Sequence, residues 1–404
     1  MTFLRKKLAG LGQNGFTLVE MIVVMAVFIS VIVIAGESFK TILTKTSILS
    51  KSAESNIEGM VGLEMFRHDL NQTGFGLPWG NTGASFPAYA EAVDSPASLF
   101  NDSDKTNKIP RAVIAGNNLT TGVLPQTDYL VLKGTTLARN KTAQEWTYVN
   151  YSSSGKAPKT WSSGNLTTND YVIVLRRVFT ETGYVNQLVQ DNGTFSQKFP
   201  TDKLATAFQP VTPQETYYIY GILAEDPSDP YAPQMPFNRT DFYVKRPTSN
   251  MPASCASNTG KLYMATLNHK DGKLTEIPIL DCVADMQITF GWDMNDDGVA
   301  DVSSSADGSS VDPGDTSVIA AVQSTLQDAA LIRNRLKFIK VYLLTQDGRR
   351  DPHFRNEKDI VVGDPDKISL TKQYTVANLN TAGWTNYRWK VYRIVVSPKN
   401  LMLN

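Results

Sequence analysis

An unbroken apolar run near the N-terminus constrains this chain more than any other feature. From Phe16 to Ala35, Glu20 is the only charged residue. A helix of this length is about 30 Å long, which is enough to cross the hydrocarbon core of a bilayer. A carboxylate inside such a helix costs a few kcal/mol and needs a partner. The run therefore predicts a membrane-spanning helix that holds one costly charge.

The leader before this run differs from an ordinary secretory signal. Three basic residues at positions 5–7 supply the positive charge of such a signal, but an ordinary signal has an apolar core of only about 7 to 15 residues and a small-residue cleavage site after it. Here the apolar residues continue to Ala35 and lead into Gly36 without such a site. Positive charge before the span keeps that end in the cytoplasm and sends the remainder outward. Cleavage is therefore expected before the span.

The motif GFTLVE at residues 15–20, behind a basic leader, resembles the processing signal of type IV prepilins and type II secretion pseudopilins. The resemblance implies that a prepilin peptidase cuts between Gly15 and Phe16 and that the new N-terminal Phe16 is methylated. It also implies that residues 1–15 are a leader and residues 16–72 a transmembrane and assembly helix. A single-pass anchor with an incidental glutamate is the alternative.

Assembly gives the charge of Glu20 a physical role. After cleavage, each subunit has a free α-amine on Phe16 in the same apolar layer, so Glu20 of an incoming subunit can pair with the Phe16 amine of a neighbour. A buried ion pair does not by itself show that an assembly is more stable. It does fix the register of two helices, because a slip leaves two buried charges unpaired. Glu20 is therefore predicted to act in filament assembly.

The helical pattern continues beyond the span. Apolar residues recur at spacings of three and four, and a single helix from about Phe16 to Asn71 would be roughly 80 Å long. We expect its second half to bury this stripe against a head domain and to end at Gly74 and Gly76. A kink or break near Gly36 is the alternative. The stripe comprises Phe39, Ile42, Thr46, Leu49, Ala53, Ile57, Met60, Leu63, Phe66 and Leu70.

Beyond the helix, the sequence favours a β-rich head. Residues 79–126 are rich in Gly, Ala, Ser, Asn and Pro with little periodicity, which indicates long loops. Four later runs are rich in β-branched and aromatic residues and predict strands. Their lengths and the lack of alternating helices favour an antiparallel sheet. The four runs are Asp128–Gly134, Asp170–Phe179, Thr216–Ala224 and Thr240–Arg246.

A hairpin with two flanking cysteines follows. The pair Asp271-Gly272 between two strand-like arms is a strong hairpin signal. Cys255 precedes the first arm and Cys282 follows the second, so a disulfide would fasten the open end. Closing this interval contributes on the order of 3 kcal/mol, and export favours oxidation; two free thiols are the alternative. Alternation of apolar and polar residues over 286–292 predicts a strand with one buried face.

The acidic segment DMNDDGVAD at residues 293–301 resembles a calcium-binding loop. Its oxygen donors fall at alternate residues, as Ca²⁺ prefers, and Gly298 stands where the loop turns sharply. Ser304 replaces the glutamate that completes an EF-hand, so we expect a shorter loop of the kind found on β proteins. A solvated acidic turn is the alternative. The candidate ligands are Asp293, Asn295, Asp297, the carbonyl of Val299 and Asp301.

The C-terminal part extends the family resemblance. In PilW-type minor pilins, a strand such as DMQITFGWD runs into an acidic segment, and strands such as LKFIKVYLLTQ and YRWKVYRIVVSPKN follow. This implies an α+β, pilin-like fold, in which a long N-terminal helix packs on an antiparallel β-sheet head with large insertions. The head is predicted to span residues 73–404. Within it, residues 251–404 are PilW-like, whereas residues 80–250 are rich in insertions and match no pilin pattern.

Neither catalysis nor nucleic-acid binding is indicated. The three histidines, His68, His269 and His353, show no metal-ligand spacing, and no nucleophile or phosphate-binding motif occurs. The chain has 39 basic and 39 acidic side chains, and loss of three basic residues with the leader makes the net charge about −3. Such a balance does not attract nucleic acid. We therefore predict a protein without enzymatic activity.

The resemblance implies one main function and two alternatives. The main one is a minor pilin that co-assembles with the major pilin and other minor pilins into type IV pili, primes assembly and lies at or near the tip. The alternatives are a minor pseudopilin of a type II secretion system and a pilus-tip adhesin that uses the unmatched insertion. Before assembly, the chain is expected to cross the inner membrane once, with its head in the periplasm.

Overall fold

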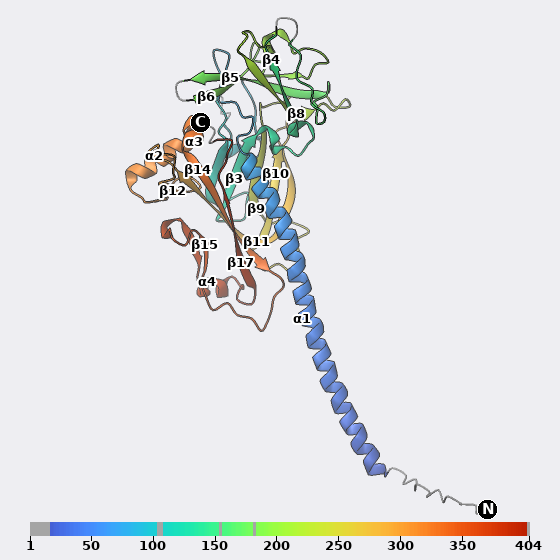
Figure 1. The fold of residues 1–404 in the computed structure, drawn as a ribbon. Coiled ribbons are helices and arrows are strands. Elements are labelled where there is room, and N and C mark those ends of the chain that lie inside the picture. The colour runs from blue at the N-terminus through green and yellow to red at the C-terminus, as the bar shows by residue number, and fades with distance from the viewer. Residues whose placement is uncertain (1–16, 103–107, 153–155, 181–182, 402–404) are drawn as a thin grey trace, which may run out of the picture. The chain divides into compact units, whose positions relative to one another are not determined.

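The computed structural model describes residues 17–102, 108–152, 156–180 and 183–401. The chain divides into two compact units, and the second unit begins at Glu54. The helix α1 (Leu18–Gln72) contributes to both units and is not interrupted at Gly36. It appears as the blue ribbon in Figure 1. Gly74 and Gly76 follow it with φ of +80° and +62°, a conformation that ends a helix and that glycine adopts without strain.

The head is built on a large antiparallel sheet. The order β13-β12-β11-β10-β9-β3-β2 forms one path, β14 pairs with β11, and β17 pairs with β14. Every pairing in this sheet is antiparallel, as the sequence predicted. The strands are β2 (Val113–Leu119), β3 (Thr127–Gly134), β9 (Asn238–Lys245), β10 (Gly260–Leu267), β11 (Leu274–Trp292), β12 (Val302–Ser305), β13 (Val311–Asp312), β14 (Leu336–Asp347) and β17 (Arg388–Val396).

The end of α1 packs on this sheet with a register that differs from the prediction. Phe66 is fully buried and stacks on Phe242 of β9, with ring centroids 4.0 Å apart. Ile57 and Met60, however, are 64% and 67% exposed. At Gly62 the helix lies so close to the sheet that a Cβ atom there would be only 1.9 Å from the carbonyl oxygen of Ile279. The close approach thus uses a glycine, and the prediction that Ile57 and Met60 are buried is wrong.

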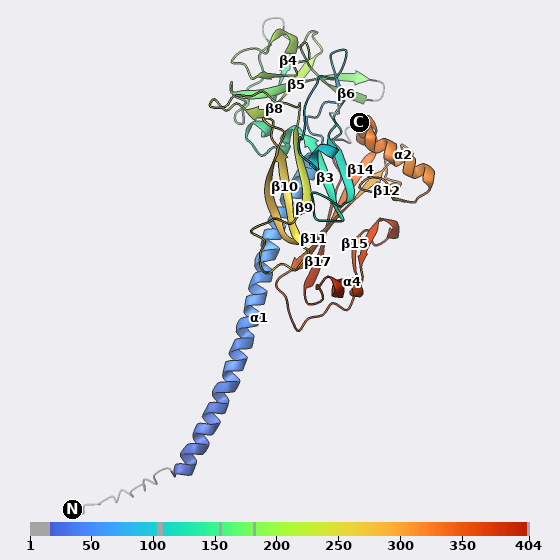
Figure 2. The same ribbon diagram turned by 180° about the vertical axis from the view of Figure 1, so that it is seen from behind.

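A smaller sheet is formed by the insertion. Its order is β1-β6-β5-β8-β4, with β7 paired to β5, and it lies at one end of the large sheet in Figures 1 and 2. Alternate residues of β5 face two separate apolar clusters, with Val172 and Val174 in one and Ile173 and Leu175 in the other. The strands are β1 (Gly80–Asn81), β4 (Trp146–Asn150), β5 (Asp170–Thr180), β6 (Gly183–Leu188), β7 (Ser196–Lys198) and β8 (Thr216–Ala224).

Several short elements that were not expected from the sequence follow β13. Asp315 and Asp328 cap the first turns of α2 and α3, each with its carboxylate accepting two backbone N–H groups. Thr375 and Asn378 form a capping box at the start of α4. These elements are α2 (Thr316–Gln327), α3 (Ala329–Arg335), β15 (Ile360–Gly363), β16 (Thr371–Tyr374) and α4 (Val376–Thr381).

In the second half of β11 the polar side chains of Asp285, Gln287 and Thr289 are buried, which contradicts the prediction of one buried face. The side chain of Asp285 is fully enclosed, and Tyr374 of β16 donates a hydrogen bond to its Oδ2 over 3.0 Å. Lys372 Nζ lies 3.3 Å from the same oxygen. The residues of β15, β16 and α4 thus cover this side of the sheet, where Leu379 and Trp384 join an apolar cluster. The alternation of apolar and polar residues identified the polar face correctly, but the residues that cover it come from a segment distant in the sequence.

The cysteines form a disulfide, Cys255–Cys282, with Cα atoms 5.1 Å apart. The hairpin of β10 and β11 turns at Gly272, which has φ of +66°. Because β11 continues to Trp292, Cys282 lies inside the strand rather than after its end. The disulfide therefore links the segment before β10 to the middle of β11 and closes an interval of 27 residues, which stabilises the fold by about 3 kcal/mol in the chain-entropy estimate.

Candidate functional site

The first candidate site is the N-terminal half of α1. Gly15 and Phe16, the predicted processing residues, lie outside the described residues. Glu20 lies in the first turn of α1, and its backbone N–H donates to Thr17 Oγ1 over 3.3 Å. The segment Leu18–Ser47 is long and apolar enough to cross a membrane.

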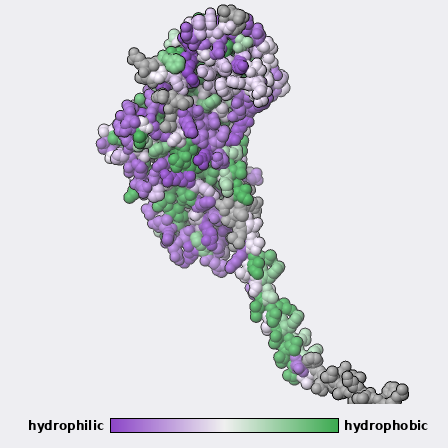
Figure 3. All heavy atoms as spheres, viewed as in Figure 1, coloured by the Kyte–Doolittle hydropathy of each residue, from purple (hydrophilic) through white to green (hydrophobic). Residues whose placement is uncertain are grey.

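The first part of this segment, residues 18–34, has a surface that is apolar apart from a few residues such as Glu20. The large apolar side chains from Leu18 to Ile34 are all more than half exposed, and Figure 3 shows them as a green surface along the helix. An apolar surface of this extent marks contact with a membrane or with another protein. The helix therefore has a surface that a bilayer or neighbouring helices must cover.

The second candidate site is the acidic loop 293–301, which connects β11 to β12. The carboxylate of Asp293 accepts backbone hydrogen bonds from Asp297 and Gly298 over 3.1 and 2.7 Å. Lys337 Nζ lies 3.1 Å from its Oδ2. Burial acts to raise the pKa of Asp293, but the hydrogen bonds from Lys337 and Gly298 outweigh burial and hold that pKa below its ordinary value. A cation at this carboxylate would compete with Lys337.

The other predicted ligands also bond within the loop. Asn295 Oδ1 accepts from the backbone of Asp297 over 3.1 Å, and Asp297 Oδ1 accepts from the backbone of Val299 over 2.8 Å. Asp301 Oδ1 accepts from the backbone of Met294 over 2.7 Å. Among the residues that the structure describes, no group of three or more His, Cys, Asp or Glu side chains is arranged to hold a metal ion. These contacts suit a self-contained acidic turn, and calcium binding stays a prediction.

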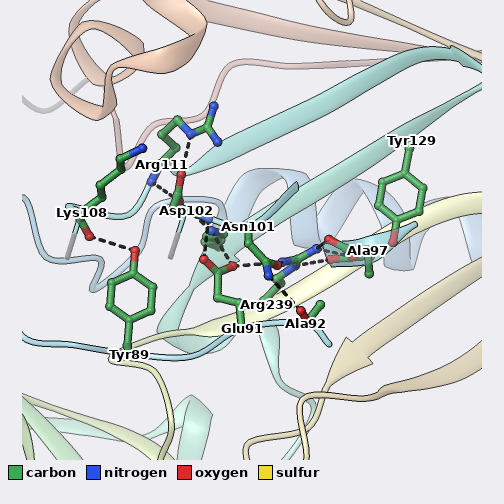
Figure 4. A network of polar contacts seen from close by, with 12 residues as sticks. Tyr89, Glu91, Ala92, Ala97, Asn101, Asp102, Lys108, Arg111, Tyr129 and Arg239 are labelled. Carbon is green, nitrogen blue, oxygen red and sulfur yellow. Dashed lines mark hydrogen bonds and ion pairs between the residues drawn. The ribbon is translucent and has the colours of Figure 1, made fainter. Parts of the chain in front are cut away.

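A network of buried charges that the sequence did not predict ties the segment around residues 91–111 to strands of the large sheet (Figure 4). Lys133 of β3 lies 2.7 Å from Glu91 Oε2 and 2.6 Å from Asp102 Oδ2. Arg239 of β9 lies 3.0 Å from Glu91 Oε2 and 2.7 Å from Asp241 Oδ1. The side chains of Lys133, Glu91 and Arg239 are fully buried, so each of these charges depends on its partners.

The electrostatics of this network indicate a structural role. Burial acts to raise the pKa of Asp102, but Lys133 and Arg111 outweigh burial and hold that pKa below its ordinary value. Arg111 Nε lies 2.5 Å from Asp102 Oδ1, and its Nη1 donates to the carbonyl of Leu326 in α2. The side chains of Lys133, Glu91 and Arg239 are fully buried, whereas that of Arg111 is 12% exposed. The network fastens the segment around residues 91–111 to β3, β9 and α2.

His68 and Asp69, which the sequence placed beside each other on the helix, form a packing pair. His68 Nδ1 lies 3.2 Å from Asp69 Oδ1, and Arg139 lies 3.2 Å from the same oxygen. Burial raises the pKa of Asp69 above its ordinary value. The pair thus connects the end of α1 to the segment after β3.

Comparison with protein families gives two matches. Residues 241–400 match the model of PilW, described as Type IV Pilus-assembly protein W. Residues 11–36 match the prokaryotic N-terminal methylation motif. The first match runs from β9 through β17, and the second covers the predicted cleavage site and much of the apolar part of α1. No curated protein and no solved structure matches the chain. The smaller sheet lies outside both matches.

Proposed function

We propose that the chain is a PilW-like minor pilin of type IV pili that primes filament growth and lies at or near the tip; the matches to the PilW model and to the methylation motif support this proposal. The methylation motif at residues 11–36 is the observation that carries the proposal, since that motif belongs to subunits that are processed for assembly. The exposed apolar surface of α1 supports it, because this surface needs neighbouring helices once the chain leaves the membrane.

The size of the head supports a position near the tip. The head comprises about 330 of the 404 residues and carries the smaller sheet in addition to the PilW-like part. A head of this bulk does not repeat densely around a thin fibre. We therefore propose low copy number, with the major pilin and other minor pilins as partners.

Processing is proposed as the entry to this pathway. A prepilin peptidase in the inner membrane cuts between Gly15 and Phe16, Phe16 is methylated, and the helix stays in the membrane with the head in the periplasm until assembly. Glu20 of the incoming subunit then pairs with the new amine of a neighbour. The role of the protein is structural, as its family suggests.

The test is mass spectrometry of the protein recovered from sheared, purified pili. We expect a mature chain that begins at methylated Phe16 and that is much less abundant than the major pilin. Substitution Gly15→Arg should leave the full-length precursor in the membrane fraction, because a bulky residue blocks the cleavage site. An intact leader in pili, or recovery only with a type II secretion machinery, would contradict the proposal.

A further inference from the structure

We propose that a hollow in the head binds an acidic sugar, such as a uronate residue of a polysaccharide. The hollow has a volume of about 930 Å³, which lies in the range of pockets that hold small ligands. Its lining comes from the loop between β2 and β3, the end of β9, the disulfide-linked segments, and the β16–α4 region. This binding function goes beyond assembly into a filament and does not rest on it.

The charge of the lining selects an anion. The described lining residues include Lys245, Arg246 and Lys372 but no carboxylate. Arg246 is exposed, and its Nη1 donates to the carbonyl of Thr259 over 2.8 Å. A guanidinium has five donors in a planar fork, so Arg246 can still grip a ligand carboxylate through two parallel hydrogen bonds.

The two lysines are held in place by the protein. Lys245 Nζ lies 2.8 Å from Glu276, and Lys372 Nζ lies 3.3 Å from the buried Asp285. Lys372 also donates to the carbonyl of Gln126, in the loop between β2 and β3, over 2.5 Å. Arg246 is therefore the cation of the lining that is best placed to bind the ligand charge, and the lysines shape the site around it.

The remaining lining suits a sugar ring rather than a bare anion. Tyr374 lies against Trp384 with ring centroids 5.8 Å apart, and the Trp384 indole N–H donates to the carbonyl of Ser257. Trp384 is buried and Tyr374 is partly exposed, so these contacts fix the Tyr374 ring as the aromatic surface that can face the apolar side of a sugar. Side-chain amides supply donors and acceptors for hydroxyl groups. The amides in the lining are Gln126, Asn258, Gln373 and Asn378.

The backbone around the hollow is preorganised. Gln126 and Asn258, which both line the hollow, have φ of 62° and 58°. Residues other than glycine adopt this region rarely, and surrounding structure must hold them there. Asn258 follows Cys255 closely, and Ala284 on the opposite side of the disulfide follows Cys282. The disulfide therefore links two segments that line the hollow.

Calorimetry on the full-length protein in non-ionic detergent tests this proposal. We expect binding of tetragalacturonate and no binding of the neutral maltotetraose. Arg246→Ala should weaken the affinity about tenfold or more, as loss of a charge-assisted bidentate contact does. Lys203→Ala, which removes a cation elsewhere on the head, should leave the affinity unchanged. Equal effects of the two substitutions would overturn the proposed site.

Two substitutions by glycine separate the contribution of the Asn258 side chain to binding from that of its backbone conformation. Asn258→Gly keeps a left-handed backbone and removes the amide, so it should weaken binding several-fold. Asn250→Gly makes the same change at φ of 62° outside the hollow and should have no effect. Binding of inorganic phosphate as tight as that of the uronate would overturn the sugar assignment. Binding of an acidic peptide without any binding of the uronate would overturn it in favour of a protein partner.

Discussion

Costly charges have different surroundings in the two units of this protein. In the head, the fully buried Lys133 and Arg239 have carboxylate partners from their own chain at 2.6 to 3.0 Å. In α1, Glu20 is the only charged residue between Phe16 and Ala35, and it lies in the part of the helix, residues 18–34, whose large apolar side chains are exposed.

This difference distinguishes substitutions that should affect folding from those that should affect assembly. Removing one partner from a buried network leaves an uncompensated charge and destabilises the fold by about 3 to 5 kcal/mol. A charge that another subunit satisfies has no such effect on its own chain. We therefore expect substitutions in the network to change the stability of the head, and substitution of Glu20 to change incorporation into pili.

The largest expected effect on stability is that of Lys133→Met. The substitution keeps the length of the side chain but leaves Glu91 and Asp102 without this cation, so the free energy of unfolding should fall by about 3 to 5 kcal/mol. Urea denaturation followed by tryptophan fluorescence measures this loss. Lys198→Met, which removes an exposed ion pair with Glu225, serves as the control and should leave the midpoint unchanged. A similar midpoint for both variants would mean that the network does not support the fold.

A smaller effect is expected from His269, a buried residue whose Nε2 lies 3.0 Å from Asn238 Oδ1. Burial lowers the pKa of His269 to about 3, whereas an unfolded histidine has a pKa of about 6.5. Between these values the unfolded chain binds a proton that the folded chain does not. This residue therefore makes stability fall as the pH falls from 6.5 towards 3, by at most about 1.4 kcal/mol per pH unit.

The difference between wild type and His269→Gln isolates this effect. Burial raises the pKa of Asp128 to about 8, and that shift makes stability fall as the pH rises through the same window, so the two slopes oppose each other in the wild type. The variant should lose the pH dependence of stability that comes from His269 and keep the one that comes from Asp128. Urea midpoints at pH 6 and pH 5 measure both. Identical pH dependence in the two proteins would contradict a neutral, buried His269.

The smallest expected effect on stability is that of calcium. Lys337 already contacts Asp293, so calcium must displace it, and a concentration equal to the dissociation constant adds only about 0.4 kcal/mol. Lys337→Met removes this competitor and should enlarge the rise in melting temperature on addition of calcium, whereas Asp293→Ala should abolish the rise. If neither the wild type nor Lys337→Met responds to calcium or chelator, the loop is only an acidic turn.

Local signals predicted the elements that local chemistry determines. The helix expected from about Phe16 to Asn71 is α1 (Leu18–Gln72), and the run Thr216–Ala224 is β8 with the same bounds. The turn at Asp271-Gly272 was recognisable because this dipeptide adopts the hairpin conformation readily. Each of these depends on residues close together in the sequence.

Features that depend on distant partners were not predictable in this way. β3 and β8 have similar compositions but belong to different sheets, and only tertiary packing distinguishes them. The contact of Gly62 with β11 depends on helix register, which the apolar periodicity did not reveal. The charged network had one local signal, since Lys133 stands in a strand-like run and Arg239 directly precedes another, but the partners Glu91 and Asp102 lie far away in the sequence.

Substitution of Glu20 tests the central claim most directly. Glu20→Ala and the control Glu37→Ala each remove one carboxylate from α1, and both proteins should insert into the membrane and keep the urea midpoint of the wild-type head. Their recovery in sheared pili, measured against the major pilin, should differ. We expect Glu20→Ala to be recovered at least about tenfold less than wild type, because an unmatched Phe16 amine in an apolar layer costs a few kcal/mol, and Glu37→Ala to match wild type. Equal recovery of all three proteins would contradict the claim that a neighbouring subunit satisfies Glu20.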